Sequence, residues 1–156
     1  RIGFRQTTYG LMPLAKILEL GNYGGFIVSY NGCQIINAQN GEILFERRIN
    51  PEMLPYLEKK AHKNGFAIFT YHDDTLLTDS PNNEHIRTEA KLNNLKIIKE
   101  EDFSIAIDFA PCKCMLVSDD EEALTGLEEH WKRRLNGTLD VFRSEPYFLE
   151  GRAMRN

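Results

Sequence analysis

The sequence predicts an α+β fold in which a mainly antiparallel sheet carries helices on one face, as in an open-faced sandwich. Asn-Gly pairs such as Asn40-Gly41 separate short apolar runs, and this spacing is the strongest local signal for a β-hairpin. Segments with helical periodicity alternate with the hairpins, and a unit of one strand pair and one helix occurs twice. Helices separated by hairpins favour an antiparallel sheet.

The N-terminal part is predicted to contain a helix, a buried strand and a hairpin. Apolar residues at helical spacing predict an amphipathic helix over residues 10–20, with Gly21 as its C-cap. The run from Phe26 to Tyr30 is almost continuously apolar, as in a strand buried on both faces, and it ends at Asn31-Gly32. The hairpin strands are expected over residues 34–38 and 43–47, around Asn40-Gly41.

The rest of the chain continues the alternation of helices and strand pairs. We expect a helix over residues 52–61, strands over 66–71 and 76–77, a helix from Pro81 to about residue 93, a strand or loop over 103–108, a strand over 113–117, a helix over 119–135, and strands over 139–143 and 147–149. Acidic residues open the 119–135 helix and basic residues close it, which suits the helix dipole and explains both charge runs.

The composition argues against several classes of partner. The 156-residue chain has a net charge of −4 with its basic residues scattered, so we expect no nucleic-acid binding. No apolar run approaches the ~20 residues that span a bilayer, so we expect no membrane association. Three cysteines do not form a disulfide framework, and reduced thiols in a cytoplasmic protein are expected.

Few residues have a spacing typical of catalysis or metal binding. Cys112 and Cys114 fall on one face of a predicted strand, and half-buried strand cysteines are favoured over a metal pair because further ligands are missing. The four histidines lie in different elements. The polar loop tip His72-Asp73-Asp74 is a candidate for function, and a solvated turn is the favoured structural alternative.

Three segments resemble the Cof-type phosphatases of the haloacid dehalogenase superfamily. Residues 5–10 (RQTTYG) and the helix after them resemble a family segment that begins with a Thr/Ser-Gly-Arg motif. Residues 26–32 (FIVSYNG) are similar to the family's strand that ends in Asn-Gly, after which the cap is inserted. Residues 142–150 (FRSEPYFLE) are similar to the exit strand of that cap.

The resemblance implies a magnesium-dependent hydrolase of small phosphorylated metabolites, of the sugar-phosphate type, whose cap selects the substrate. The family's Asp-x-Asp-Gly-Thr nucleophile motif, its lysine and its late acidic motif are missing from this sequence. We therefore expect no catalytic residue and no bound metal in this chain, and Mg2+ in the intact parent enzyme. The same resemblance assigns substrate contacts to Arg5, Asn31 and Gly32 at the active-site edge, and to His72 and Asp73 at the leaving group.

The resemblance also divides the chain. Residues 5–32 correspond to a remnant of the catalytic core and residues 33–150 to the cap, whereas residues 1–4 and 151–156 are expected to be additions from cloning. Apolar side chains of the remnant would lack partners within the chain, which predicts self-association through residues 10–30. A free-standing α+β module that binds a ligand or a partner, without enzymatic activity, is the alternative.

Overall fold

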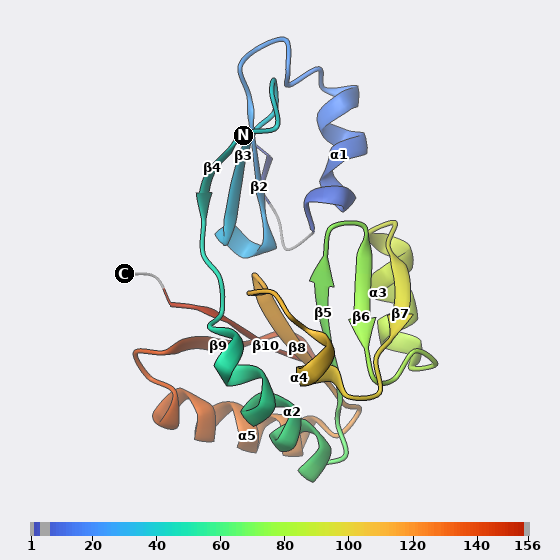
Figure 1. The fold of residues 1–156 in the computed structure, drawn as a ribbon, viewed down its shortest axis with the longest axis vertical. Coiled ribbons are helices and arrows are strands. Elements are labelled where there is room, and N and C mark those ends of the chain that lie inside the picture. The colour runs from blue at the N-terminus through green and yellow to red at the C-terminus, as the bar shows by residue number, and fades with distance from the viewer. Residues whose placement is uncertain (1, 4–6, 155–156) are drawn as a thin grey trace.

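The chain forms two β-sheets, one above the other in the view of Figure 1. The computed structural model describes residues 2–3 and 7–154. A four-stranded sheet with the order β1-β2-β3-β4 lies in the upper part of the view, and a six-stranded sheet with the order β7-β6-β5-β8-β10-β9 lies below it. The segment after β4 descends along one side and connects the two sheets.

The four-stranded sheet contains the predicted N-terminal elements. Its strands are β1 (Ile2–Gly3), β2 (Phe26–Ser29), β3 (Gln34–Asn37) and β4 (Ile43–Glu46), with the single-turn 3-10 helix η1 (Tyr30–Gly32) between β2 and β3. Strands β1 and β2 are parallel and the other pairs are antiparallel. The predicted hairpin is confirmed, and Gly41 in its turn has a φ of 76°, which glycine adopts without strain.

Helix α1 (Thr8–Ile17) packs on this sheet and is shorter than the sequence predicts. Its buried residues Leu11 and Ala15 form a small core with Ile27 of β2. The helix ends at Ile17 with Leu18 as its C-cap, so the prediction that Gly21 caps it is wrong.

Only some of the apolar side chains of this region are exposed. This corrects the expectation that all of them lack partners in the chain. Leu11, Ile27 and Val28 are buried because α1 and the neighbouring strands cover β2. Leu18 and Phe26 remain 49% and 44% exposed. Part of the expected apolar surface therefore persists.

The six-stranded sheet is mainly antiparallel. Its strands are β5 (Ala67–His72), β6 (Thr75–Thr78), β7 (Lys96–Lys99), β8 (Lys113–Val117), β9 (Leu139–Glu145) and β10 (Phe148–Ala153). The accompanying helices are the 3-10 turn η2 (Pro51–Met53), α2 (Leu54–Lys63), α3 (Glu84–Leu92), α4 (Phe103–Ala106) and α5 (Glu121–Arg134). Every pair of neighbouring strands is antiparallel except β6 and β7, which are parallel. The predicted α+β class is confirmed.

The two faces of this sheet carry separate cores because successive side chains of a strand point to opposite faces. Ile68 of β5 and Leu116 of β8 belong to the core formed with α2 and α5. Phe69 and Met115, one position along each strand, belong to a second core to which α3 contributes Ile86. Helices α2 and α5 therefore share one face as expected, whereas α3 packs on the opposite face (Figure 1).

Two short elements of the six-stranded part add to the predicted set. Strand β7 has no predicted counterpart, because lysines at both ends hide the apolar pair Ile97-Ile98. The segment left open as strand or loop forms the short helix α4, whose Phe103 is buried in the core beside α2. Among the helices of the described residues, none is long and apolar enough to cross a bilayer.

Candidate functional site

A cavity of about 570 Å³ lies between the two sheets and is the candidate binding site. Tyr30 and Arg48 line it on the side of the four-stranded sheet, together with the start of α1. From the six-stranded sheet, the β5–β6 turn contributes His72 and Asp73, and the segment before β8 contributes Phe109. The fold thus brings two sequence-predicted residues together with residues that are distant in the chain.

The β5–β6 turn holds His72 and Asp73 in a defined conformation. Asp73 has a φ of 49°, in the left-handed region that Asp and Asn tolerate better than most residues. The hydroxyl of Thr75 donates a hydrogen bond to the carbonyl of His72 at 2.6 Å. The His72 ring stacks on Phe109 with 4.1 Å between ring centroids. The exposed His72 ring is therefore held in place, and Oδ2 of Asp73 lies 3.6 Å from its Nε2.

Tyr30 and Tyr71 form an aromatic wall of the cavity, with 5.7 Å between their ring centroids. Burial raises the pKa of Tyr30 well above its usual value, and the nearby Cys112 and Asp73 raise it further. Burial also raises the pKa of Tyr71, and the adjacent Glu89 adds to this effect. Both phenols therefore stay neutral across the physiological pH range.

Arg48 provides a fixed positive charge in the cavity. Its Nη2 donates to Oε1 of Glu46 at 2.5 Å, and its Nη1 donates to the carbonyl of Ala110 at 2.8 Å. Glu46 also accepts a hydrogen bond from Nε2 of Gln34 at 2.7 Å, and the hydroxyl of Thr8 donates to Oε1 of Gln34 at 2.6 Å. Burial lowers the pKa of Arg48, but the hydrogen bond and charge of Glu46 help to outweigh this, so the pKa is raised overall.

Asn31 and Gly32 lie at the joint between the two sheets rather than in the lining of the cavity. Tyr30, Asn31 and Gly32 have consecutive φ values of 50°, 57° and 89°, which non-glycine residues adopt only with support from their surroundings. Nδ2 of Asn31 donates to Oε1 of Glu150 at 2.9 Å, and the Asn31 carbonyl accepts from Nη1 of Arg152 at 2.8 Å. These bonds tie the turn to β10, and the predicted substrate contacts of Asn31 and Gly32 stay predictions.

Arg5 lies outside the described residues, so its predicted substrate contact also stays a prediction. Within residues 2–3 and 7–154, no group of three or more His, Cys, Asp or Glu side chains is arranged to hold a metal ion. The lining of the cavity combines phenols, an amide, a guanidinium and a single carboxylate. This set suits a polar organic ligand better than Mg2+, which prefers several oxygen ligands in octahedral geometry.

Sequence reasoning missed Tyr30, Arg48 and Phe109 as cavity residues. They come from three separate segments that meet only in the folded chain. One usable signal was present, since the Arg47-Arg48 pair directly follows an apolar hairpin strand. The two arginines have different surroundings in the fold. Arg47 donates to the carbonyl of Met154 at 3.0 Å, whereas Arg48 lines the cavity.

Comparison with known protein families identifies the class of protein. The family of haloacid dehalogenase-like hydrolases matches residues 7–154, so the chain belongs to that family. The resemblance predicted from the three sequence segments is thereby confirmed. A search of curated proteins returned no match.

Solved structures support the same assignment. A haloacid dehalogenase-like hydrolase from Bacteroides thetaiotaomicron is 38% identical with a TM-score of 0.88, and the match covers 96% of this chain and 56% of that protein. A protein from Thermotoga maritima is 22% identical with a TM-score of 0.76, covering 96% of this chain and 55% of that one. A sugar phosphatase of haloacid dehalogenase subclass IIB is 14% identical with a TM-score of 0.59, covering 89% and 50%. At these identities the last two similarities show the fold alone.

The chain thus spans about half the length of the structures it matches, between 50% and 56% of each of these three proteins.

Proposed function

We propose that this chain determines the substrate specificity of a magnesium-dependent phosphatase that hydrolyses small phosphorylated metabolites of the sugar-phosphate type. Residues 33–150 act as the cap, and residues 5–32 belong to the catalytic core. The nucleophile, the lysine and the Mg2+ ligands belong to the rest of the enzyme, so this chain alone has no phosphatase activity. The observation that carries the proposal is the cavity between the sheets, where aromatic rings and charged groups converge.

The lining of the cavity favours an uncharged polyol over a second anionic group. Arg48 is already paired with Glu46, and Asp73 adds a further carboxylate, so positive charge is not in excess. A hydroxyl group can accept a hydrogen bond from a guanidinium and donate one to a carboxylate. The aromatic side chains Tyr30, His72 and Phe109 offer apolar surface to the carbon skeleton of a sugar.

Phosphoryl transfer gives a reason for such a division of labour. The reaction depends on positioning and on charge stabilisation at the transferred group, which the core and its Mg2+ supply. One phosphate ester differs from another in its leaving group, and a cap that closes over the leaving group can select it. A substitution in the cavity should therefore change the choice of substrate more than the chemical step.

The expected cytoplasmic location stays a prediction.

Substitution of Asp73 by Asn in the complete enzyme tests the proposal. The change removes the negative charge and keeps a side chain that tolerates the left-handed backbone. We expect kcat/KM for a hexose phosphate to fall about 10- to 100-fold, which corresponds to the ~1.5–3 kcal/mol of a hydrogen bond to a charged group. The kcat/KM for an aryl phosphate, which has no sugar hydroxyls, should change less than about threefold.

The neighbouring variant Asp74→Asn is the matched control. Asp74 lies in the same turn, but its carboxylate pairs with Lys96 at 3.1 Å and does not line the cavity. Both substrates should be hydrolysed at the wild-type rate by this variant. Equal losses for the sugar and aryl substrates in Asp73→Asn would contradict a role in leaving-group recognition.

We also propose that the isolated chain self-associates through residues 10–30. Ile17 of α1 and its C-cap residue Leu18 are 76% and 49% exposed, and Met12 and Leu14 of the same helix are 49% and 40% exposed. Sedimentation should detect a dimer or larger species, and Ile17→Lys should shift it toward the monomer. Leu92→Lys on α3, where the leucine is 68% exposed, is the control that should leave association unchanged. A stable wild-type monomer at high concentration would refute this proposal.

A further inference from the structure

The two sheets touch at a second place, where the start of α1 meets the end of α3. Gly10 of α1 packs directly against Asn93, the C-cap residue of α3. A Cβ on Gly10 would lie 2.7 Å from Oδ1 of Asn93 and 3.3 Å from its Cα. Gly10 lies within a regular helix and its φ is not positive, so the backbone does not require glycine there. The absence of a side chain is needed for the close approach itself.

Asn93 uses both ends of its amide at this contact. Its Oδ1 accepts the backbone N–H of Thr7 at 3.0 Å, one of the helix N-terminal donors that α1 cannot satisfy within itself. Its Nδ2 donates to the carbonyl and to Oε1 of Glu89, both at 3.0 Å. Asn93 is 2% exposed and Thr7 is fully buried, so water does not readily replace these bonds.

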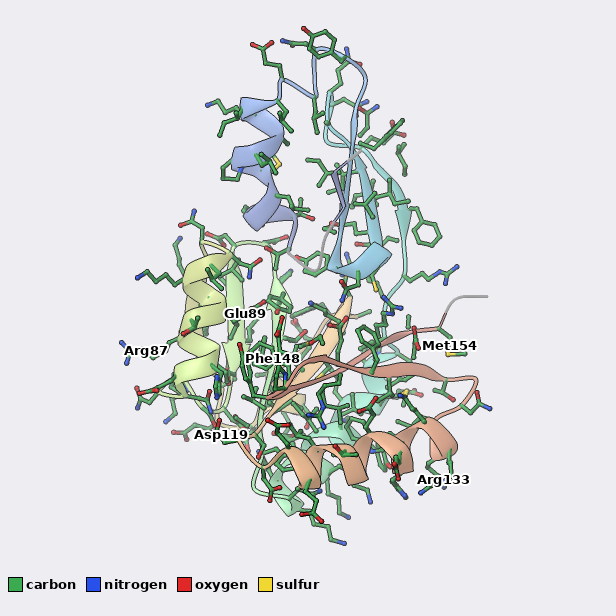
Figure 2. The ribbon with its side chains drawn as sticks, turned by 180° about the vertical axis from the view of Figure 1, so that it is seen from behind. Arg87, Glu89, Asp119, Arg133, Phe148 and Met154 are labelled. Atoms are coloured by element: carbon green, nitrogen blue, oxygen red, sulfur yellow. The ribbon has the colours of Figure 1, made fainter. Side chains whose placement is uncertain are left out.

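A short chain of contacts leads from Asn93 to the cavity. Oε1 of Glu89 also accepts a hydrogen bond from the hydroxyl of Tyr71 at 2.7 Å, and the Tyr71 ring contacts Tyr30. Figure 2 shows Glu89 turned from α3 toward the sheet near Phe148, whereas Arg87 points outward. Tyr30 and Tyr71 line the cavity, and so does Thr8, the residue after Thr7.

This contact lies on the opposite side of the molecule from the segment that connects the sheets. In Figure 1, α1 lies above α3 on the right, while the chain after β4 descends on the left. Other hydrogen bonds between the two parts of the chain run from Asn31 to Glu150 and from Arg47, in the connecting segment, to the carbonyl of Met154. If the connecting segment acts as a hinge, the contact on the opposite side is where the two sheets can separate or close.

We propose that Gly10 and Asn93 form a latch that holds the six-stranded sheet closed against α1 and sets the width of the cavity. Asn93 acts as a positioning residue, through Glu89 and Tyr71, and does not contact substrate. The effect on substrate selection rests on the proposed function, whereas the latch itself is a property of this chain. Its two parts can therefore be tested separately.

The first test compares Gly10→Ala with Gly126→Ala in the 156-residue chain. Alanine favours a helix over glycine at both positions, and a Cβ on Gly126 in α5 meets no atom within 4 Å. Gly126→Ala should leave amide exchange at Thr7 unchanged. Gly10→Ala should accelerate exchange of the Thr7 amide about tenfold or more, in spite of the better helix propensity, because the new Cβ would clash with Oδ1 of Asn93, the acceptor of the Thr7 amide.

A second variant, Asn93→Ala, removes the acceptor for Thr7 without adding bulk to α1. It should also accelerate exchange at Thr7, and amides in the centre of β8 should stay protected, which shows that the sheet remains folded. Unchanged exchange at Thr7 in both variants would overturn the latch.

The second test measures kinetics of the complete enzyme that carries these substitutions. We expect the KM for a sugar phosphate to rise about tenfold, with little change in kcat for an aryl phosphate, since a loosened cavity weakens leaving-group contacts and leaves the chemistry intact. Faster Thr7 exchange with an unchanged KM would overturn the proposal that the latch sets the width of the cavity. The Asp73→Asn experiment decides the proposed function independently of either outcome.

Discussion

Glu150→Ala is expected to lower the free energy of unfolding by about 3–5 kcal/mol, the usual cost of removing one partner of a buried ion pair. Glu150 is fully buried and Lys113 is 3% exposed, and Nζ of Lys113 lies 3.6 Å from Oε2 of Glu150. The substitution removes a buried carboxylate that pairs with this buried cation. It also removes the acceptor for the side-chain amide of Asn31, and this hydrogen bond supports the left-handed turn at residues 30–32. Urea denaturation of the purified chain measures the loss.

Two control variants separate the buried charge from other effects. Asp140→Ala breaks the ion pair with Arg152, in which the Asp140 side chain is 37% exposed, and should cost less than about 1 kcal/mol. The double variant Lys113→Met/Glu150→Met removes both charges of the buried pair and should recover most of the stability, because no buried charge is left unbalanced. A Glu150→Ala variant as stable as Asp140→Ala would show that the buried pair contributes little.

The folded chain is expected to lose stability steeply above pH 9. Burial raises the pKa of Cys112 from its ordinary 9.0 to about 12, and burial raises the pKa of Cys114 as well. The pKa values of Tyr30 and Tyr71 are raised by burial too. Above the ordinary thiol pKa the unfolded chain releases protons that the folded chain retains, so the free energy of unfolding falls as pH rises.

The size of this effect follows from the two thiols. Each contributes about 1.4 kcal/mol per pH unit above its unfolded pKa, which gives a loss of about 3–4 kcal/mol between pH 8 and 10.5. Urea denaturation at these two pH values measures it. The double variant Cys112→Ala/Cys114→Ala should show a much shallower dependence, and an equally steep one would assign the effect to other groups.

Local signals allowed the elements around Asn40-Gly41 and the helices α2 and α5 to be predicted, because turn chemistry and helical periodicity act within a few residues. Strand β7 could not be predicted in the same way. Its four residues pair in parallel with β6 after the α3 crossover, and this pairing stabilises a segment whose own pattern is weak. Tertiary pairing decided the outcome there.

The candidate site shows the same limit. The loop tip His72-Asp73 could be found because polar residues between two apolar strands are visible in the sequence. The cavity that gives them a context depends on Tyr30, Arg48 and Phe109, which no local pattern connects. Lys113 carried an overlooked signal, since a lysine inside an otherwise apolar strand needs a buried counter-charge, and Glu150 provides it.

The alternation along β5 and β8 has a consequence for how such proteins can diversify. Ala67, Phe69 and Tyr71 belong to the core beside the cavity, whereas Ile68 belongs to the core under α2 and α5. On β8, Met115 and Val117 belong to the core beside the cavity, and Cys114 and Leu116 belong to the core under α2 and α5. Of these residues Tyr71 lines the cavity, and the others on its face of the sheet pack in the core behind it. A substitution on that face can therefore shift Tyr71, while the separate core under α2 and α5 keeps the domain folded.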